Sequence, residues 1–166
     1  MQSHDRSKLL RDVGFAIFAV AIVAVASILG QIATYPNLAP WYSSLSKPPF
    51  NPPDWIFAPV WTALYALMAL AAWRILRLSR ATRGRSAALI FFFVQLVLNS
   101  AWSWMFFGAN SPLLGLVNIV PQFLAVLAAV FAFHRLDRMA SLCLVPLAAW
   151  VAFASILNFA IWWLNG

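Results

Sequence analysis

Five long stretches of apolar residues, separated by polar connections, dominate the pattern of the chain. Each stretch is long enough to cross a bilayer, for which an α-helix needs about 20 residues, and none carries a charge in its middle. The pattern predicts membrane-spanning helices at about 13–34, 55–76, 87–107, 112–135 and 139–164. We therefore expect an all-α integral membrane protein, a single five-helix bundle over residues 1–166 with a basic tail at 1–12.

The one long connection, residues 35–54, joins the first two predicted helices. Its consecutive prolines favour extended backbone, and the rings of Trp41 and Tyr42 need an apolar surface to rest on. Asn51 is placed to act as the N-cap of the second helix, with Pro52 in its first turn. We expect this connection to fold as a stiff lid over one end of the bundle.

The third predicted helix carries the most informative polar stripe. Gln95, Asn99, Trp102 and Phe106 follow one another at steps of four, three and four residues, which places them on one helix face. Amides and an indole are costly when they face lipid, so this face is expected to point inward. Two roles stay open: the side chains bind neighbouring helices, or they line a cavity.

Two other predicted helices present similar faces, each built from a small residue beside larger aromatic or amide groups. On the second helix these are Ala58, Trp61 and Tyr65, and on the fifth they are Trp150, Ala154 and Asn158. The three faces together predict an inward-facing aromatic lining.

The first predicted helix has small residues at intervals of four, Ala26, Gly30 and Thr34. Such a face permits close approach of another helix, either within the chain or from a second copy. Both alternatives remain open at the level of sequence.

Composition supports the membrane assignment, since 64% of the residues are hydrophobic, 9% are charged and the mean hydropathy is +0.85. The net charge of +7 lies in short segments beside the apolar stretches, where it sets topology, and we expect no nucleic-acid partner. With the N-terminus in the cytoplasm, Lys47 is the one basic residue on the outer side. The basic connection 74–85 is then a solvated cytoplasmic loop, and the lid lies outside.

Several kinds of chemistry find little support in the sequence. Proton relays and ion-coupled pumping need charged groups in the middle of the spans, and no Asp, Glu, Lys or Arg is present there, which disfavours a small exporter. His4, His134 and the single Cys143 lack metal-ligand spacing, so no metal site and no covalently bound cofactor are expected.

The nine tryptophans instead favour a binding role. A cavity walled by indoles and phenyl rings, with a few amides, suits a flat, mostly apolar, polycyclic ligand. Lys47 in the lid either pairs with a carboxylate of that ligand or is a solvated loop lysine.

Several motifs, taken together, are specific. They are the run from Trp41 to Pro48, the run from Asn51 to Tyr65, the pattern from Gln95 to Gly108, and the run from Pro146 to Asn158. In this arrangement the chain, from about Gly30 to Trp162, resembles the translocator protein family, also called tryptophan-rich sensory protein or peripheral benzodiazepine receptor.

The resemblance implies a five-helix bundle, commonly a homodimer, that binds porphyrins, sterols and synthetic benzodiazepine-type ligands beneath the first loop. By that similarity the pocket is lined by Tyr42, Ala58, Trp61, Asn99, Trp102, Trp150 and Ala154. To these we add Lys47, Gln95 and Asn158 from the patterns above. Trp61 and Trp150 match tryptophans linked, in some bacterial members, to light-dependent breakdown of protoporphyrin IX.

The family's sterol-recognition pattern is incomplete, because Phe159 and Trp163 stand where it needs Tyr and a basic residue. The expected function is a tetrapyrrole-binding sensor, scavenger or carrier. The alternative is a porphyrin-degrading enzyme in which Trp61 and Trp150 are catalytic. A bacterial cell membrane is the favoured location, while some relatives are placed in outer membranes.

Overall fold

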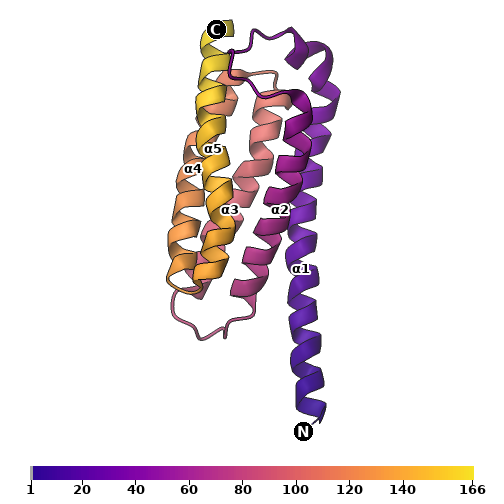
Figure 1. Ribbon diagram of the computed structural model, residues 1–166, viewed down its shortest axis with the longest axis vertical. Coiled ribbons are helices and arrows are strands. Elements are labelled where there is room, and N and C mark those ends of the chain that lie inside the picture. Colours follow the sequence, from indigo (N-terminus) through magenta and orange to yellow (C-terminus); the bar gives the residue numbers. More distant parts are fainter. Residues whose placement is uncertain (1) are drawn as a thin grey trace.

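The computed structural model describes the chain from residue 2 to residue 166, and its side chains from Arg6 onward. Over these residues the fold is all-α, with five long helices that run alternately up and down a bundle (Figure 1). They are α1 (Gln2–Thr34), α2 (Asp54–Leu76), α3 (Arg85–Ser103), α4 (Pro112–His134) and α5 (Arg138–Asn165). Each helix is long and apolar enough to cross a membrane, so the expected five-helix membrane fold is confirmed.

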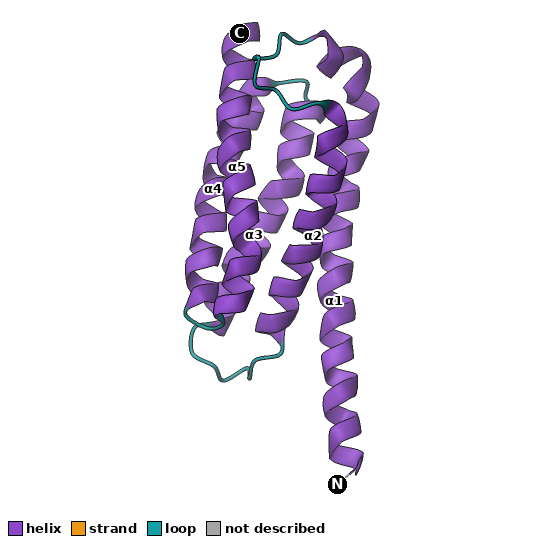
Figure 2. Cartoon of the chain, viewed as in Figure 1, coloured by secondary structure: helices purple, strands orange, loops and turns teal. Residues whose placement is uncertain are grey.

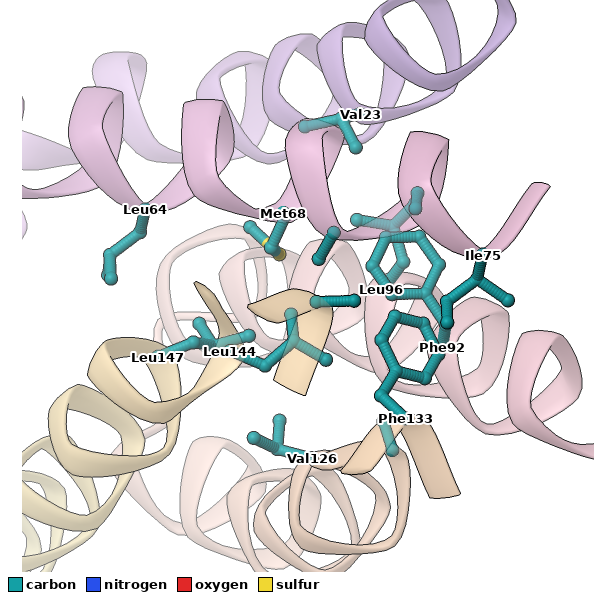
Figure 3. Packing of buried hydrophobic residues seen from close by; sticks show 14 of the residues in the cluster. Val23, Leu64, Met68, Ile75, Phe92, Leu96, Val126, Phe133, Leu144 and Leu147 are labelled. Carbon is teal, nitrogen blue, oxygen red and sulfur yellow. The ribbon is translucent and has the colours of Figure 1, made fainter. Parts of the chain in front are cut away.

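The five helices form a closed ring. α4 packs against α3 and α5, α5 packs also against α2, and α1 lies between α2 and α3. In the half of the bundle away from the lid, buried apolar side chains from all five helices pack together in the middle of the ring (Figure 3). There Phe92 stacks on Phe133 with ring centroids 5.8 Å apart, and Met68 and Leu144 are fully buried. The other end is covered by the connection between α1 and α2 (Figure 2).

α1 begins eleven residues earlier than the expected helix at 13, since it starts at Gln2. The prediction of a tail at 1–12 was therefore wrong for residues 2–12; residue 1 and the side chain of His4 lie outside the described residues. Polar side chains do not end a helix that extends beyond the bilayer. In α1 this extension is also attached to the end of α2 by contacts of Asp12. Arg77 Nη2 lies 3.0 Å from Asp12 Oδ2, and the indole N–H of Trp73 donates to the Asp12 carbonyl at 3.2 Å.

The small-residue face of α1 packs within the chain. Ser100 on α3 donates its hydroxyl to the Ala26 carbonyl at 2.8 Å. A Cβ on Gly30 would lie 3.2 Å from Ser103 Oγ, which shows how closely α3 approaches. This face thus joins α1 to α3, one of the two roles that the sequence left open.

α2 begins at Asp54 with Pro53 as its N-cap, so Asn51 does not cap this helix and the predicted start near Pro52 was wrong. A residue that precedes proline avoids helical backbone, and Pro52 precedes Pro53. The extended segment therefore lasts to Pro53. The predicted start of the fourth helix at residue 112 was correct, because α4 begins at Pro112 and Ser111 caps it by accepting a hydrogen bond from the Leu114 amide at 3.2 Å.

The connection between α2 and α3 is only partly solvated, in contrast to the expectation for residues 74–85. Arg85 is 8% exposed and donates to the carbonyls of Ile75 and Leu76 at 3.2 and 3.0 Å. It thereby satisfies carbonyls at the end of α2 that have no partner within the helix.

Asp137 links α5 to α2. Its carboxylate caps α5 by accepting from the amides of Met139 and Ala140, and it forms a two-point ion pair with Arg74 at 2.8 and 3.1 Å. Burial raises the pKa of this carboxyl, but the bonds from Arg74 and from the two amides outweigh burial and leave the pKa below its ordinary value.

Two substitutions separate the roles of Asp137. Asp137→Asn keeps a good N-cap but loses the ion pair, which we expect to lower the free energy of unfolding by about 0.5 kcal/mol at pH 7. Asp137→Ala loses both, for a total of about 1.5 kcal/mol. Thermal unfolding in detergent measures both differences.

The difference in the free energy of unfolding between wild type and Asp137→Asn should depend on pH, and the direction of that dependence follows from the pKa of Asp137. Because the folded pKa of Asp137 lies below the unfolded value of about 3.9, the stability contributed by its charge is complete above that value. It is lost as the pH falls through the lower folded pKa. A gap between wild type and Asp137→Asn that stays constant from pH 7 to pH 3 would contradict this account.

Candidate functional site

A cavity of about 460 Å³ lies inside the ring beneath the lid. All five long helices contribute to its wall, and the lid contributes Tyr42, Lys47 and Asp54 at its end. This volume is within the range of small-molecule sites, roughly 300–1,000 Å³. Among the described residues, Lys47 and Asp54 are the charged groups that line it.

The structure brings nearly all the predicted site residues together in this one cavity. Its wall includes Tyr42, Lys47, Ala58, Trp61, Asn99, Trp102, Trp150, Ala154 and Asn158. Gln95 was also predicted to line the site, but it lies outside the cavity wall, fully buried, with its amide nitrogen 3.7 Å from Met68 Sδ. It shares the helix face of Asn99 but lies one turn deeper, where the ring is filled.

One side of the cavity is an aromatic wall shared by α2 and α5. Trp61 and Trp150 meet edge to face with ring centroids 6.4 Å apart. Phe57 contacts Trp150 in the same manner at 5.8 Å, and Tyr65 lies tilted against Trp61 at 5.4 Å. Edge-to-face contacts fix the ring orientations and leave ring faces available to a flat ligand.

The opposite side is formed where α3 ends in the short π-helix η3 (Trp104–Gly108). Trp102 stacks on Phe106 with ring centroids 4.8 Å apart. Tyr42 reaches this group from the lid side, from the short π-helix η2 (Leu38–Tyr42), and packs 5.4 Å from Phe107. The aromatic groups of the bundle and of the lid are therefore continuous.

The amides of the site bind helices and line the cavity at the same time. Tyr65 donates its hydroxyl to Asn99 Oδ1 at 2.9 Å, which joins α2 to α3. Asn158 Oδ1 accepts from the indole N–H of Trp102 at 3.1 Å, and its Nδ2 donates to the Pro112 carbonyl at 2.8 Å. Both roles proposed for these polar side chains therefore apply.

Sequence reasoning missed several wall residues, most notably Gln122 on α4. It is 3% exposed, lines the cavity, and its Oε1 has no hydrogen-bond partner among the described residues. The available signal was its position one turn after Asn118 on the same helix face. Phe57 and Phe153 were not selected either, because aromatic residues are common on every span. Tyr65 and Phe106 were placed on the inward faces but not among the site residues.

The lid is attached to the far end of α5. The Ser46 amide donates to Asn165 Oδ1 and Asn165 Nδ2 donates to the Ser46 carbonyl, both at 2.9 Å. Lys47 Nζ lies 4.5 Å from the centre of the Tyr42 ring, a cation–π contact. Two segments far apart in sequence, the lid and the end of α5, thus meet at the lid end of the cavity.

The sequence model of the TspO/MBR family matches residues 18–164, which include every predicted site residue. The chain belongs to the TspO/MBR family. It is a multi-pass integral membrane protein, as the five spans of the described chain indicate.

Relatives within this family come from distant organisms. The chain is 45% identical to "Tryptophan-rich protein TspO" of Chlorobaculum tepidum over 131 residues, 78% of this chain and 83% of that protein. It is 41% identical to the protein of the same name from Archaeoglobus fulgidus, over 87% of this chain and 94% of that one. The "Translocator protein" of Bos taurus is 34% identical over 90% of this chain and 87% of its own length.

The attachment between Ser46 and Asn165 can be tested by hydrogen exchange. Asn165→Ala removes the two exposed hydrogen bonds to Ser46, each with a net contribution of about 1 kcal/mol or less, together with the bond from Asn165 Nδ2 to the Ile161 carbonyl within α5. We expect amide exchange in residues 43–53 to accelerate by roughly 5-fold, as measured by mass spectrometry on the detergent-solubilised protein.

Asn37→Ala is the matched control, because Asn37 donates only to the Ala33 carbonyl within its own helical segment. It should leave exchange in residues 43–53 unchanged. Equal exchange rates in wild type and Asn165→Ala would show that the attachment does not hold the lid.

Proposed function

We propose that this member of the TspO/MBR family binds tetrapyrroles such as protoporphyrin IX, and other flat polycyclic molecules, in the cavity beneath the lid. The observation that carries the proposal is that Trp61, Trp150 and Asn99, from three different helices, line one cavity. Indole faces offer a flat ring a large contact area, and the amides offer a few oriented polar contacts.

The charge distribution of the cavity supports this ligand class. Its deeper wall is uncharged over the described residues, whereas Lys47 and Asp54 lie at the lid end, Lys47 half-buried against Tyr42. A ligand with a large apolar ring and carboxylates at one edge matches this gradient, with the carboxylates beside Lys47. The biological role that follows is that of a sensor, scavenger or carrier of such rings, with no covalently bound cofactor.

A second candidate function is light-dependent degradation of the bound porphyrin with molecular oxygen as the oxidant. The specific observation in its favour is the edge-to-face contact of Trp61 and Trp150 within the cavity wall. Both indoles would lie against the ring of a bound macrocycle.

We further propose the arrangement in the cell. Apart from Lys47, the basic residues of the described chain lie on α1 before Val13 or at the connections that follow α2 and α4, at the end opposite the lid. By the positive-inside rule this distribution supports a cytoplasmic N-terminus and a lid on the outer side. A bacterial cell membrane suits five apolar helices. The functional unit is a homodimer, as the family resemblance implies.

Binding is tested by quenching of tryptophan fluorescence during titration with protoporphyrin IX. We expect Trp61→Phe, Trp150→Phe and Asn99→Leu each to weaken binding by roughly 3- to 10-fold, since each removes one oriented contact of about 1 kcal/mol. Trp163→Phe is the control, because Trp163 is 73% exposed on the outside of the bundle and lies away from the cavity wall.

Equal affinities in wild type and all three cavity variants would exclude this cavity as the site. Illumination of the same samples tests the second candidate. Degradation requires new absorbing products that depend on protein, oxygen and light and that disappear in the Trp61 and Trp150 variants. Bleaching equal to that in empty micelles would exclude it.

A further inference from the structure

A second cavity lies at the opposite end of the molecule from the lid. It has a volume of about 380 Å³ and lies between α1, the end of α2 and the start of α5. Since a water molecule occupies about 30 Å³ of the liquid, this space corresponds to about a dozen waters. Its lining includes four basic side chains and two carboxylates, together with Leu78; the ionic groups are Lys8, Arg11, Asp12, Arg74, Arg77 and Asp137.

Both carboxylates are already committed within the protein. Asp137 accepts two bonds from Arg74 and two from backbone amides. Asp12 pairs with Arg77 at 3.0 Å. Lys8 and Arg11 are exposed and have no carboxylate within ion-pair distance among the side chains described. Two of the four basic side chains are therefore neutralised by the two carboxylates. Lys8 and Arg11 remain without a carboxylate partner among the described side chains.

The walls are also held in place. The Trp73 indole donates to the Asp12 carbonyl at 3.2 Å, and its ring lies 4.4 Å from the Arg77 guanidinium carbon. These contacts fasten α1 to the end of α2, while the bond between Arg74 and Asp137 fastens α2 to the start of α5. The unpaired cations thus project from a fixed helix rather than from a mobile tail.

The cavity lies where the helices change from apolar to charged. On α1 the exposed apolar side chains begin with Leu9 and Leu10, between Lys8 and Arg11, and continue with Val13 and Ile17. On α5 they begin with Met139 and Leu142. An indole such as that of Trp73 is typical of this boundary. The cations are consequently at the level of lipid headgroups, with apolar surface directly beside them for acyl chains.

We propose that this cavity is a binding site for the headgroup of an anionic phospholipid, with the phosphate held by Lys8 and Arg11. A phosphate oxygen accepts strong charge-assisted hydrogen bonds from both side chains, and its charge offsets the two unpaired cations. The fixed pairs around it, Arg74 with Asp137 and Arg77 with Asp12, shape the site. This site is independent of the cavity beneath the lid.

Native mass spectrometry of the full-length protein in detergent tests the proposal. The protein is titrated with phosphatidylglycerol and, separately, with phosphatidylcholine of the same acyl chains. A basic residue near an anionic lipid contributes about a factor of five in affinity, so two give a preference for phosphatidylglycerol of about 25-fold. The variant Lys8→Gln with Arg11→Gln should reduce that preference to about 2-fold or less.

The matched control is Arg80→Gln with Arg83→Gln, which removes the same charge from two exposed arginines that do not line the cavity. It should keep a preference above 10-fold. Equal loss in both double variants would show that general attraction, not this site, selects the lipid, and a wild type without preference would also overturn the proposal. Displacement of phosphatidylglycerol by inorganic phosphate at millimolar concentration would assign the site to free phosphate instead.

Discussion

The structure depends on a constraint that the bilayer imposes: a polar side chain on a membrane-spanning helix needs its partner inside the protein. Asn158 shows the consequence most clearly. Its two amide atoms join Trp102 of α3 and the first residue of α4, Pro112, to α5, so that three helices are fixed at one point. Tyr65 and Asn99 make the corresponding connection between α2 and α3. These two sets of hydrogen bonds lie in the wall of the cavity and fix the positions of α2, α3, α4 and α5 relative to one another.

The connection at Asn158 requires a glycine on α4. A Cβ on Gly115 would lie 2.7 Å from Phe106 Cδ2 and 2.8 Å from Asn158 Oδ1, closer than real side-chain contacts allow. The absence of a side chain there lets α4 approach the aromatic group and the amide together. The half of the bundle that contains the cavity is thus packed as specifically as the half that contains the apolar core. The cavity is the space that remains between aromatic rings and amides whose positions are fixed by contacts with one another.

Much of this could be predicted from the sequence, because the relevant signals are periodic. The stripe containing Asn99 and Trp102 identified an inward face, and the apolar stretch from residue 112 identified the start of α4. No periodic signal in the sequence shows how far along a helix axis the cavity extends. Gln95 lies on the predicted face, yet Met68 fills the ring at its level. The orientation of Gln122 likewise depends on where α4 sits in the ring.

The errors at helix ends have a related cause. Hydropathy marks where a helix leaves the membrane, not where it ends, so the extension of α1 before Val13 depended on contacts of Asp12 that are distant in sequence. Asn51 has the right side chain for an N-cap, but Pro53 keeps the preceding backbone extended. The same distant contacts create the basic cavity, which is why no local motif indicated it.

The proposed function requires that the cavity beneath the lid receive a flat ring between Trp61, Trp102 and Trp150. Fluorine NMR of protein labelled with 5-fluorotryptophan, titrated with protoporphyrin IX, tests it most directly, because ring currents shift only nearby nuclei. We expect large changes in the fluorine chemical shifts of those three tryptophans. We expect none for Trp73, which contacts Asp12 at the end opposite the lid, or for Trp163 on the outer surface. Shifts at Trp163 with the three cavity resonances unchanged would contradict it.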